Sequence, residues 1–372
     1  MVLTGDWIIS RHADLVWLIG GALAGYAMFY LHAVLHADML AVWFVWLIIL
    51  DSPHFFGTYA RTYFDREEWH RRRGLLLGSL GLFLVGPLLL FISFALFQSG
   101  AANYRWPFLA LVAIVHVWAY WHVVRQHYGI LALYRRKNRD LDPLDRCIDN
   151  LFLYVSLLAP FLAFVVRHPD SRQALGLPVA YGTWEGRWTG MTVAAVVIVL
   201  FLFILRQVHR RQQQQPLNLP KILFLGAVIP LHLLICYSSA VLTAPLLGFA
   251  LFVTIFHDIQ YHALIWFYQK NRYRGSDAVR YGFASWLGKR FLHYVAAAIL
   301  MGTILGFLGC LLDVIPGCSP MLLTGAIPLF GEFTIREFLF TVFLGFMMHH
   351  YLLDQFIWRP SRDSHLQRDL HL

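Results

Sequence analysis

The chain has 372 residues, of which 59% are hydrophobic and only 14% are charged. Soluble globular proteins are about 25% charged, so this composition argues against a soluble protein and indicates one that crosses a membrane several times. The formal net charge of +9 does not indicate a nucleic-acid-binding protein, because the basic residues lie between apolar stretches rather than in one patch. The four cysteines form no CxxC pair, which argues against a thiolate zinc site or an iron–sulfur cluster.

Apolar stretches of about 20 residues, each long enough for one membrane crossing, recur along the chain. They predict an all-α, polytopic membrane protein with about ten transmembrane helices in a single transmembrane domain over residues 1–372. The predicted spans are Leu15–Leu35, Met39–Tyr59, Leu75–Phe97, Trp106–Tyr128, Ile148–Val166, Met191–Arg206, Ile222–Tyr237, Leu246–Tyr268, Phe291–Leu312 and Glu337–Trp358.

The distribution of Lys and Arg predicts the orientation of these spans. The N-terminus and the segments that follow the even-numbered spans hold 24 of the 30 basic residues, whereas the opposite side holds five. Basic loops face the cytoplasm. We therefore expect an integral protein of a bacterial inner membrane, with both termini in the cytoplasm.

Ionisable side chains interrupt four of the spans, near residues 39–59, 106–128, 246–268 and 337–358. Such residues are costly in a membrane helix and by default mark a functional site. All four spans run in the same direction, so their polar ends share one depth near the cytoplasmic side. The candidate metal ligands are Asp51, His54, His122, His127, His257, Asp258, His262, His349, His350 and Asp354.

Helix geometry decides which of these candidates share a face. Residues three or four positions apart lie on one side of a helix, as His350 and Asp354 do. His122 and His127 differ by roughly 140° around a helix. Three explanations stay open: the helix ends between them, they bind different ions, or only one of them is a ligand.

The ligand types indicate the metal. Imidazole and carboxylate groups without thiolate suit iron, zinc, manganese or copper, and histidine-rich sites with open positions are typical of oxygen-activating non-haem iron. One zinc ion takes four ligands. Ten candidates therefore suit two ions with further supporting residues, and we predict two irons, with zinc and copper as alternatives.

Short histidine motifs resemble those of a known group of enzymes. The sequences HVVRQH (His122–His127) and HDIQYH (His257–His262) are similar to the HX3–4H boxes of the membrane fatty acid desaturase, hydroxylase and alkane monooxygenase group. The pair His349 and His350 resembles the end of that group's HXXHH box, although Phe346 replaces the first histidine. The resemblance implies two irons bound on the cytoplasmic side.

A second, fainter resemblance involves the dipeptide Pro53-His54. It is similar to part of a motif in the bacterial carotene-cleaving membrane oxygenases. These are also multi-span, histidine-dependent iron enzymes.

These observations predict an O2-dependent membrane oxidoreductase that hydroxylates, desaturates or oxidatively cleaves a hydrophobic, lipid-like substrate. We expect Tyr261 to relay protons or electrons, and Arg125 to pair with an aspartate or to bind a substrate carboxylate or lipid headgroup. A ferredoxin-like cytoplasmic donor would dock on the basic face. One alternative is a haem-binding membrane redox protein. The other is a proton or metal-ion transporter, and a transporter would carry polar residues through the whole membrane depth.

Overall fold

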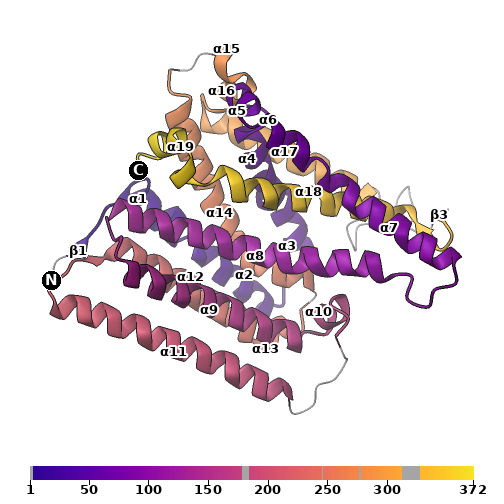
Figure 1. The fold of residues 1–372 in the computed structure, drawn as a ribbon, viewed down its shortest axis with the longest axis horizontal. Coiled ribbons are helices and arrows are strands. Elements are labelled where there is room, and N and C mark those ends of the chain that lie inside the picture. The colour runs from indigo at the N-terminus through magenta and orange to yellow at the C-terminus, as the bar shows by residue number, and fades with distance from the viewer. Residues whose placement is uncertain (1–2, 178–183, 245, 276–277, 312–326) are drawn as a thin grey trace. The chain divides into compact units, whose positions relative to one another are not determined.

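A computed structural model describes residues 3–177, 184–244, 246–275, 278–311 and 327–372. Nearly all regular structure in this part of the chain is helical, which confirms the all-α fold class (Figure 1). Eight helical segments within it are long and apolar enough to cross a membrane, as an integral membrane protein requires. They are Arg11–Ala33, Met39–Arg61, Arg73–Gln98, Trp106–Lys137, Pro143–Arg167, Trp184–Gln212, Leu219–Tyr237 and Phe291–Cys310.

Two further helices coincide with the remaining predicted spans but are less apolar. Helix α14 extends over Leu246–Arg272 and helix α18 over Ile335–Ile357, which makes them 27 and 23 residues long. Both exceed the roughly 20 residues that one crossing needs, but both carry candidate ligands, in the middle of α14 and in the C-terminal half of α18. The number of crossings and the location of the termini therefore stay predictions.

The chain forms two compact units, which are described separately. The first unit comprises Met1–Met39, Val123–Leu264 and Leu370–Leu372, and the second comprises Leu40–His122 and Ile265–Asp369. The divisions fall inside α14 and inside α8 (Trp106–Lys137), so each of these helices contributes residues to both units.

The first unit includes the C-terminal part of α8 and most of α14. Its other elements are β1 (Leu3–Thr4), α1 (Arg11–Ala13), η1 (Asp14–Ile19), α2 (Ala22–Ala33), α9 (Pro143–Arg167), α10 (Pro169–Ala174), α11 (Trp184–Gln212), β2 (Leu217–Asn218), α12 (Leu219–Tyr237) and α13 (Ser239–Leu242). Helix α9 packs along both α11 and α12, as Figure 1 shows, and α12 also contacts α2 and η1. Strands β1 and β2 pair in parallel, with Leu3 opposite Leu217.

Charged side chains connect the helix ends of the first unit. Arg210 lies 2.6 Å from Asp140 and 2.7 Å from Asp145. Lys221 is fully buried and lies 2.7 Å from Asp140 and 2.9 Å from Asp149. Buried charges of this kind are tolerated when they are paired. Basic residues that predict the orientation of the chain therefore also hold its helices together.

The second unit contains the other helices and one short hairpin. Its elements, besides parts of α8 and α14, are α3 (Met39–Trp46), η2 (Leu47–Asp51), α4 (Ser52–Arg61), α5 (Arg66–Arg71), α6 (Arg73–Ser79), α7 (Leu82–Gln98), α15 (Ala278–Tyr281), α16 (Phe283–Leu287), α17 (Phe291–Leu311), β3 (Pro328–Phe330), β4 (Phe333–Thr334), α18, η3 (Pro360–Arg362) and α19 (Ser364–Asp369). Helix α18 packs along α7 and contacts α4, while α4 also packs on α17. Figure 1 shows α7 and α18 side by side.

A widened helical turn precedes the segment that carries His54. Helix α4 follows the π-helical turn η2 without interruption, and Pro53 lies in its first turn. Proline lacks the N–H group that an α-helical turn requires, and such wide turns often occur at functional sites. A Cβ atom on Gly302 of α17 would lie 2.3 Å from the carbonyl oxygen of Ile48. Only glycine therefore lets α17 pack directly against this turn.

Candidate metal centre

Four polar residues from three helices meet inside the second unit. His54 lies on α4, His122 on α8, and His350 and Asp354 on α18. All four are buried. Each offers one ligand atom, and these atoms all lie within 4.8 Å of one another. The four residues, called the His–Asp cluster below, could hold a metal ion.

Helix periodicity explains how α4 and α18 form this cluster. His350 and Asp354 are four residues apart and so share one face of α18. His54 lies on the face of α4 that meets them, and its ring centre is 4.4 Å from that of His350, edge to face. The ring of His122 approaches from α8, with its centre 4.8 Å from that of His350.

The distances within the cluster fit a metal ion. Metal–nitrogen bonds of about 2.0–2.1 Å place two ligand atoms at most about 4.2 Å apart. The Nε2 atoms of His122 and His350 are 3.2 Å apart, which corresponds to an angle of about 100° at a shared ion with such bonds. The largest separation of 4.8 Å exceeds the limit for two ligands on opposite sides of one ion by about 0.6 Å, so metal binding requires the four side chains to move closer together.

Thr58 determines which nitrogen of His350 is available. Its Oγ1 donates to Asp354 Oδ1 at 2.8 Å and also lies 2.8 Å from His350 Nδ1. The hydroxyl has only one proton. Because that proton points to the carboxylate, Nδ1 of His350 must carry its own proton and donate it to Thr58. The lone pair of His350 therefore sits on Nε2, which faces His122, and such fixing of a tautomer is typical of metal-ligating histidines.

Aromatic side chains surround the cluster. The ring of Phe55 lies 4.8 Å from that of His350, and the ring of Tyr351 stacks on His122 at 4.6 Å. An apolar shell of this kind limits solvent access to a metal site and lowers the local dielectric constant. Charged and polar interactions inside the cluster are strengthened as a result.

Arg61 connects α4 to the end of α18, two turns from His54. It is fully buried, and its Nη2 donates to the carbonyl oxygen of Ile357 at 2.6 Å. The guanidinium lies 3.9 Å from the ring centre of Trp358 and 4.5 Å from that of Tyr268. These contacts keep the ligand-bearing faces of α4 and α18 in register.

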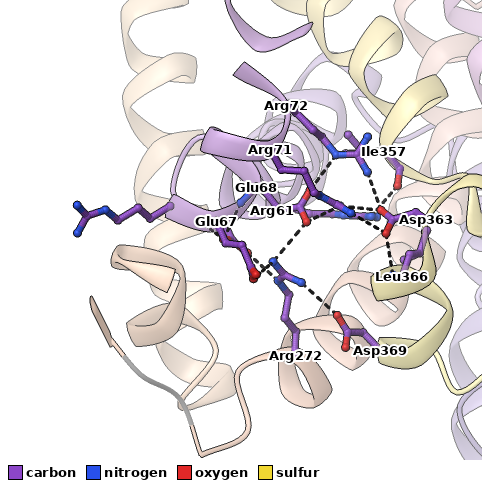
Figure 2. A network of polar contacts seen from close by, with 12 residues as sticks. Arg61, Glu67, Glu68, Arg71, Arg72, Arg272, Ile357, Asp363, Leu366 and Asp369 are labelled. Carbon is purple, nitrogen blue, oxygen red and sulfur yellow. Dashed lines mark hydrogen bonds and ion pairs between the residues drawn. The ribbon is translucent and has the colours of Figure 1, made fainter. Parts of the chain in front are cut away.

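A network of ion pairs also connects the chain that follows α4 with the chain that follows α18 (Figure 2). The fully buried Arg272 lies 2.7 Å from Asp65, 2.9 Å from Glu67 and 3.3 Å from Asp369. Figure 2 also shows two neighbouring arginines that reach Asp363. The network joins the segment after α4 to the segment after α18, so it supports the same pair of helices as Arg61.

Two carboxylates of this network, Asp363 and Glu68, have a lowered pKa. Burial raises the pKa of Asp363, but hydrogen bonds from Arg71 and from the backbone N–H of Leu366, together with the charges of Arg71 and Arg61, outweigh burial and bring the pKa well below its usual range. Burial also raises the pKa of Glu68, whereas the charge of Arg61 and hydrogen bonds from Arg71 lower it to a net value below the usual range. Both groups are therefore ionised at neutral pH and offset the charge of the arginines.

His349, although adjacent to His350, contacts a different set of residues. Its Nε2 lies 2.8 Å from Tyr63 Oη. Its ring packs against those of Tyr59 and Phe83, with centres 5.7 Å and 5.3 Å away. Consecutive helical residues point about 100° apart, which explains why only one of the two histidines belongs to the cluster.

The predicted ligands His122 and His127 also have different neighbours. Helix α8 continues unbroken through both, so it does not end between them. His127 belongs to the first unit, where it is fully buried. Its ring centre lies 5.4 Å from that of His232 and 5.6 Å from that of Phe256.

The remaining predicted ligands lie on two other elements. Asp51 is the last residue of η2 and is half-buried. His257 and Asp258 are buried, and His262 is half-buried, in the part of α14 that belongs to the first unit. Gln126 donates to the carbonyl oxygen of His257 at 2.7 Å.

The two predicted catalytic residues belong to the first unit. Arg125 donates a hydrogen bond to Tyr154 Oη, and its guanidinium lies 4.6 Å from the ring centre of Tyr128. Tyr261 is buried in α14. Their catalytic roles stay predictions.

Thr58 was not among the predicted site residues, although its position in the sequence carries a signal. Thr58 follows His54 by four residues and precedes Arg61 by three, which places all three on one face of a helix. A hydroxyl at such a position is easily dismissed, because it carries no charge.

Replacing Thr58 by valine is expected to weaken metal binding about 10–100-fold, the usual effect of removing a partner that orients a ligand. The change retains the shape of the side chain but removes the hydroxyl that joins His350 to Asp354. A chelator competition titration measures the affinity. Thr62→Val is the matched control, since Thr62 is also buried on the same segment but its hydroxyl donates to the carbonyl oxygen of Thr58. Equal losses in both variants, or no loss in Thr58→Val, would contradict the orienting role.

Comparison of the chain with protein-family models, with curated proteins and with solved structures found no match.

Proposed function

We propose that the protein is a membrane-embedded, metal-dependent oxidoreductase that uses O2 to act on a hydrophobic substrate from the lipid phase. The observation that carries this proposal is the His–Asp cluster, in which four buried ligands converge inside an apolar helical unit. Ionisable residues in membrane helices mark functional sites by default. Neutral imidazoles with one carboxylate are suited to a divalent transition metal.

Iron is the metal that suits the proposed chemistry. A tetrahedral zinc ion would be saturated by four protein ligands and would be structural. An octahedral iron would retain two open positions next to three imidazoles and one carboxylate, as oxygen-activating sites require. Such an iron would supply the activation of O2. The cluster holds ligands for one ion, so a second iron would need other ligands from the predicted set.

The residues around the cluster have defined tasks in this proposal. Thr58 keeps the proton on Nδ1 of His350 and orients Asp354, whose negative charge offsets part of the charge of the metal. Phe55 and Tyr351 restrict water and present an apolar surface to a lipid-like substrate. Hydroxylation, desaturation and oxidative cleavage all suit this arrangement.

The geometry of the cluster favours a non-haem metal over haem. Two imidazoles that ligate one haem iron from opposite sides have their ligating nitrogens about 4 Å apart, given metal–nitrogen bonds of about 2.0 Å. The Nε2 atoms of His122 and His350 are only 3.2 Å apart, and the ring centres of His54 and His350 only 4.4 Å. A porphyrin does not fit between rings this close.

The location of the cluster and its electron donor are part of the proposal. We place the protein in a bacterial inner membrane with the cluster near the cytoplasmic side, because the basic ends of the predicted spans lie on that side. A ferredoxin-like donor on the basic face would supply the electrons for reactions that reduce O2 to water.

The test begins with protein produced with iron supplied and purified in detergent. We would measure iron, zinc, copper and manganese per chain, record the visible spectrum, and follow O2 uptake by the chemically reduced protein. We expect about one iron per chain, no Soret band, and O2 uptake that is lost in a His54→Ala variant. Stoichiometric zinc without O2 uptake would replace the oxidoreductase with a structural site, a Soret band would indicate the haem protein, and a metal-free chain would favour the transporter.

A further inference from the structure

The connector between α14 and α17 has an exposed apolar face. Val279 is 74% exposed, Phe283 50% and Trp286 43%. The rings of Phe283 and Trp286 stack with centres 5.3 Å apart and planes inclined by 16°. Large apolar side chains that gather on a polar surface mark an interaction site.

The opposite side of this connector is fixed to the body of the second unit. Tyr281 and Ala284 form a buried cluster with Tyr273, against which Phe64 packs. The backbone N–H of Ala284 also donates to the carbonyl oxygen of Phe64 at 3.0 Å. Since one side is held by packing and by a hydrogen bond, the aromatic face is displayed in a defined direction.

Contact with α17 places this face beside the first turn of a candidate membrane span. Helix α17 is one of the apolar helices long enough to cross a membrane, and its first residues Phe291 and Leu292 are 54% and 71% exposed. Trp286 stacks on His293 in the first turn of this helix, with ring centres 4.4 Å apart and planes inclined by 10°. Trp286 therefore lies at the depth where α17 enters the bilayer, the level at which tryptophan is enriched.

Exposed basic residues precede and follow the aromatic face in the chain. Lys270, Arg274, Lys289 and Arg290 are all exposed. Lys289 and Arg290 lie between α16 and α17, directly beside the predicted membrane boundary. Apolar and basic residues at this depth complement an anionic membrane surface. Each Lys or Arg near such a surface adds about 1 kcal/mol to the free energy of membrane binding.

We propose that the connector between α14 and α17, which contains α15 and α16, is an interfacial segment that binds anionic phospholipid. Phe283 and Trp286 enter the headgroup region, while Lys289 and Arg290 contact the phosphate groups. The inference does not depend on the chemistry of the His–Asp cluster, and the variants that test it leave that cluster intact.

Lipid titration followed by native mass spectrometry tests the role of charge. In the double variant Lys289→Gln/Arg290→Gln we expect about 25-fold weaker binding of phosphatidylglycerol, or about fivefold per charge. Binding of zwitterionic phosphatidylcholine should change little. The matched control is Arg139→Gln/Arg211→Gln, which removes two exposed basic residues of the first unit. An equal loss in both double variants would show a general charge effect and overturn the site.

Fluorescence quenching in phosphatidylglycerol vesicles tests the placement of the aromatic face. We would compare the wild type with Trp286→Phe, using lipids brominated at the top of the acyl chain and, separately, water-soluble acrylamide. The signal that Trp286→Phe removes should be quenched by the brominated lipid. Quenching of that signal by acrylamide alone would place Trp286 in water and overturn the proposal.

Discussion

Replacing His350 by alanine is expected to remove the metal ion from the protein. The change deletes one ligand of the His–Asp cluster and also the partner that Thr58 orients at 2.8 Å. The loss of affinity should therefore exceed the roughly 10–100-fold effect of removing an orienting partner alone. Elemental analysis after dialysis against a weak chelator measures the result, which we expect to fall from about one ion per chain, as a single four-ligand site would hold, to almost none.

The adjacent histidine offers a matched control for this experiment. His349→Ala removes the same side chain one position earlier on α18, but from a position that contacts Tyr63 rather than the cluster. We expect this variant to retain its metal, with circular dichroism and size-exclusion profiles confirming that both variants fold. Loss of metal from His349→Ala but not from His350→Ala would refute the assignment of ligands.

Replacing Arg272 by methionine is expected to destabilise the protein by about 3–5 kcal/mol. The guanidinium is fully buried and lies within 3.3 Å of Asp65, Glu67 and Asp369. Methionine occupies a similar volume but removes the cation that these carboxylates share. The effect should be largest at Asp65, which is fully buried, because a buried charge that loses its ion-pair partner carries a large desolvation cost. Thermal or denaturant unfolding in detergent, followed by fluorescence, measures the change.

Arg280 provides the comparison at the surface of the same network. Its side chain is 49% exposed and lies 2.7 Å from Glu67, a carboxylate that it shares with Arg272. Exposed ion pairs contribute about 0–1 kcal/mol, so Arg280→Gln should have a small effect on stability. If the two variants proved equally destabilising, burial would not be the reason for the importance of Arg272.

Spacing along single helices made half of the cluster predictable. His350 and Asp354 stand four residues apart in an apolar stretch, which is enough to place them on one face and to mark that face as functional. The same reasoning could not separate His350 from His349, because both are imidazoles in the same span. Only the helices that pack against α18 distinguish them: α4 presents His54 and Thr58 to one, whereas Tyr63 contacts the other.

The buried ion pairs that hold the helices of the His–Asp cluster together were harder to predict from the sequence. Arg272 and Asp363 lie in charged stretches between or after the apolar spans and were not among the predicted site residues, yet both are buried and ion-paired. The pairing of residues about 200–300 positions apart in the chain depends on which helices become neighbours. Composition and periodicity carry no information on that choice.

By itself, the sequence determined that this is an all-α membrane protein and that polar residues concentrate in four of its apolar spans. Those properties follow from the cost of burying polar groups and from the 3.6-residue repeat of a helix, both of which are local. The tertiary structure alone decided that His54, His122, His350 and Asp354 meet. That convergence depends on contacts between helices distant in sequence, such as the close approach of α17 at Gly302 and the hydrogen bond between Arg61 and Ile357.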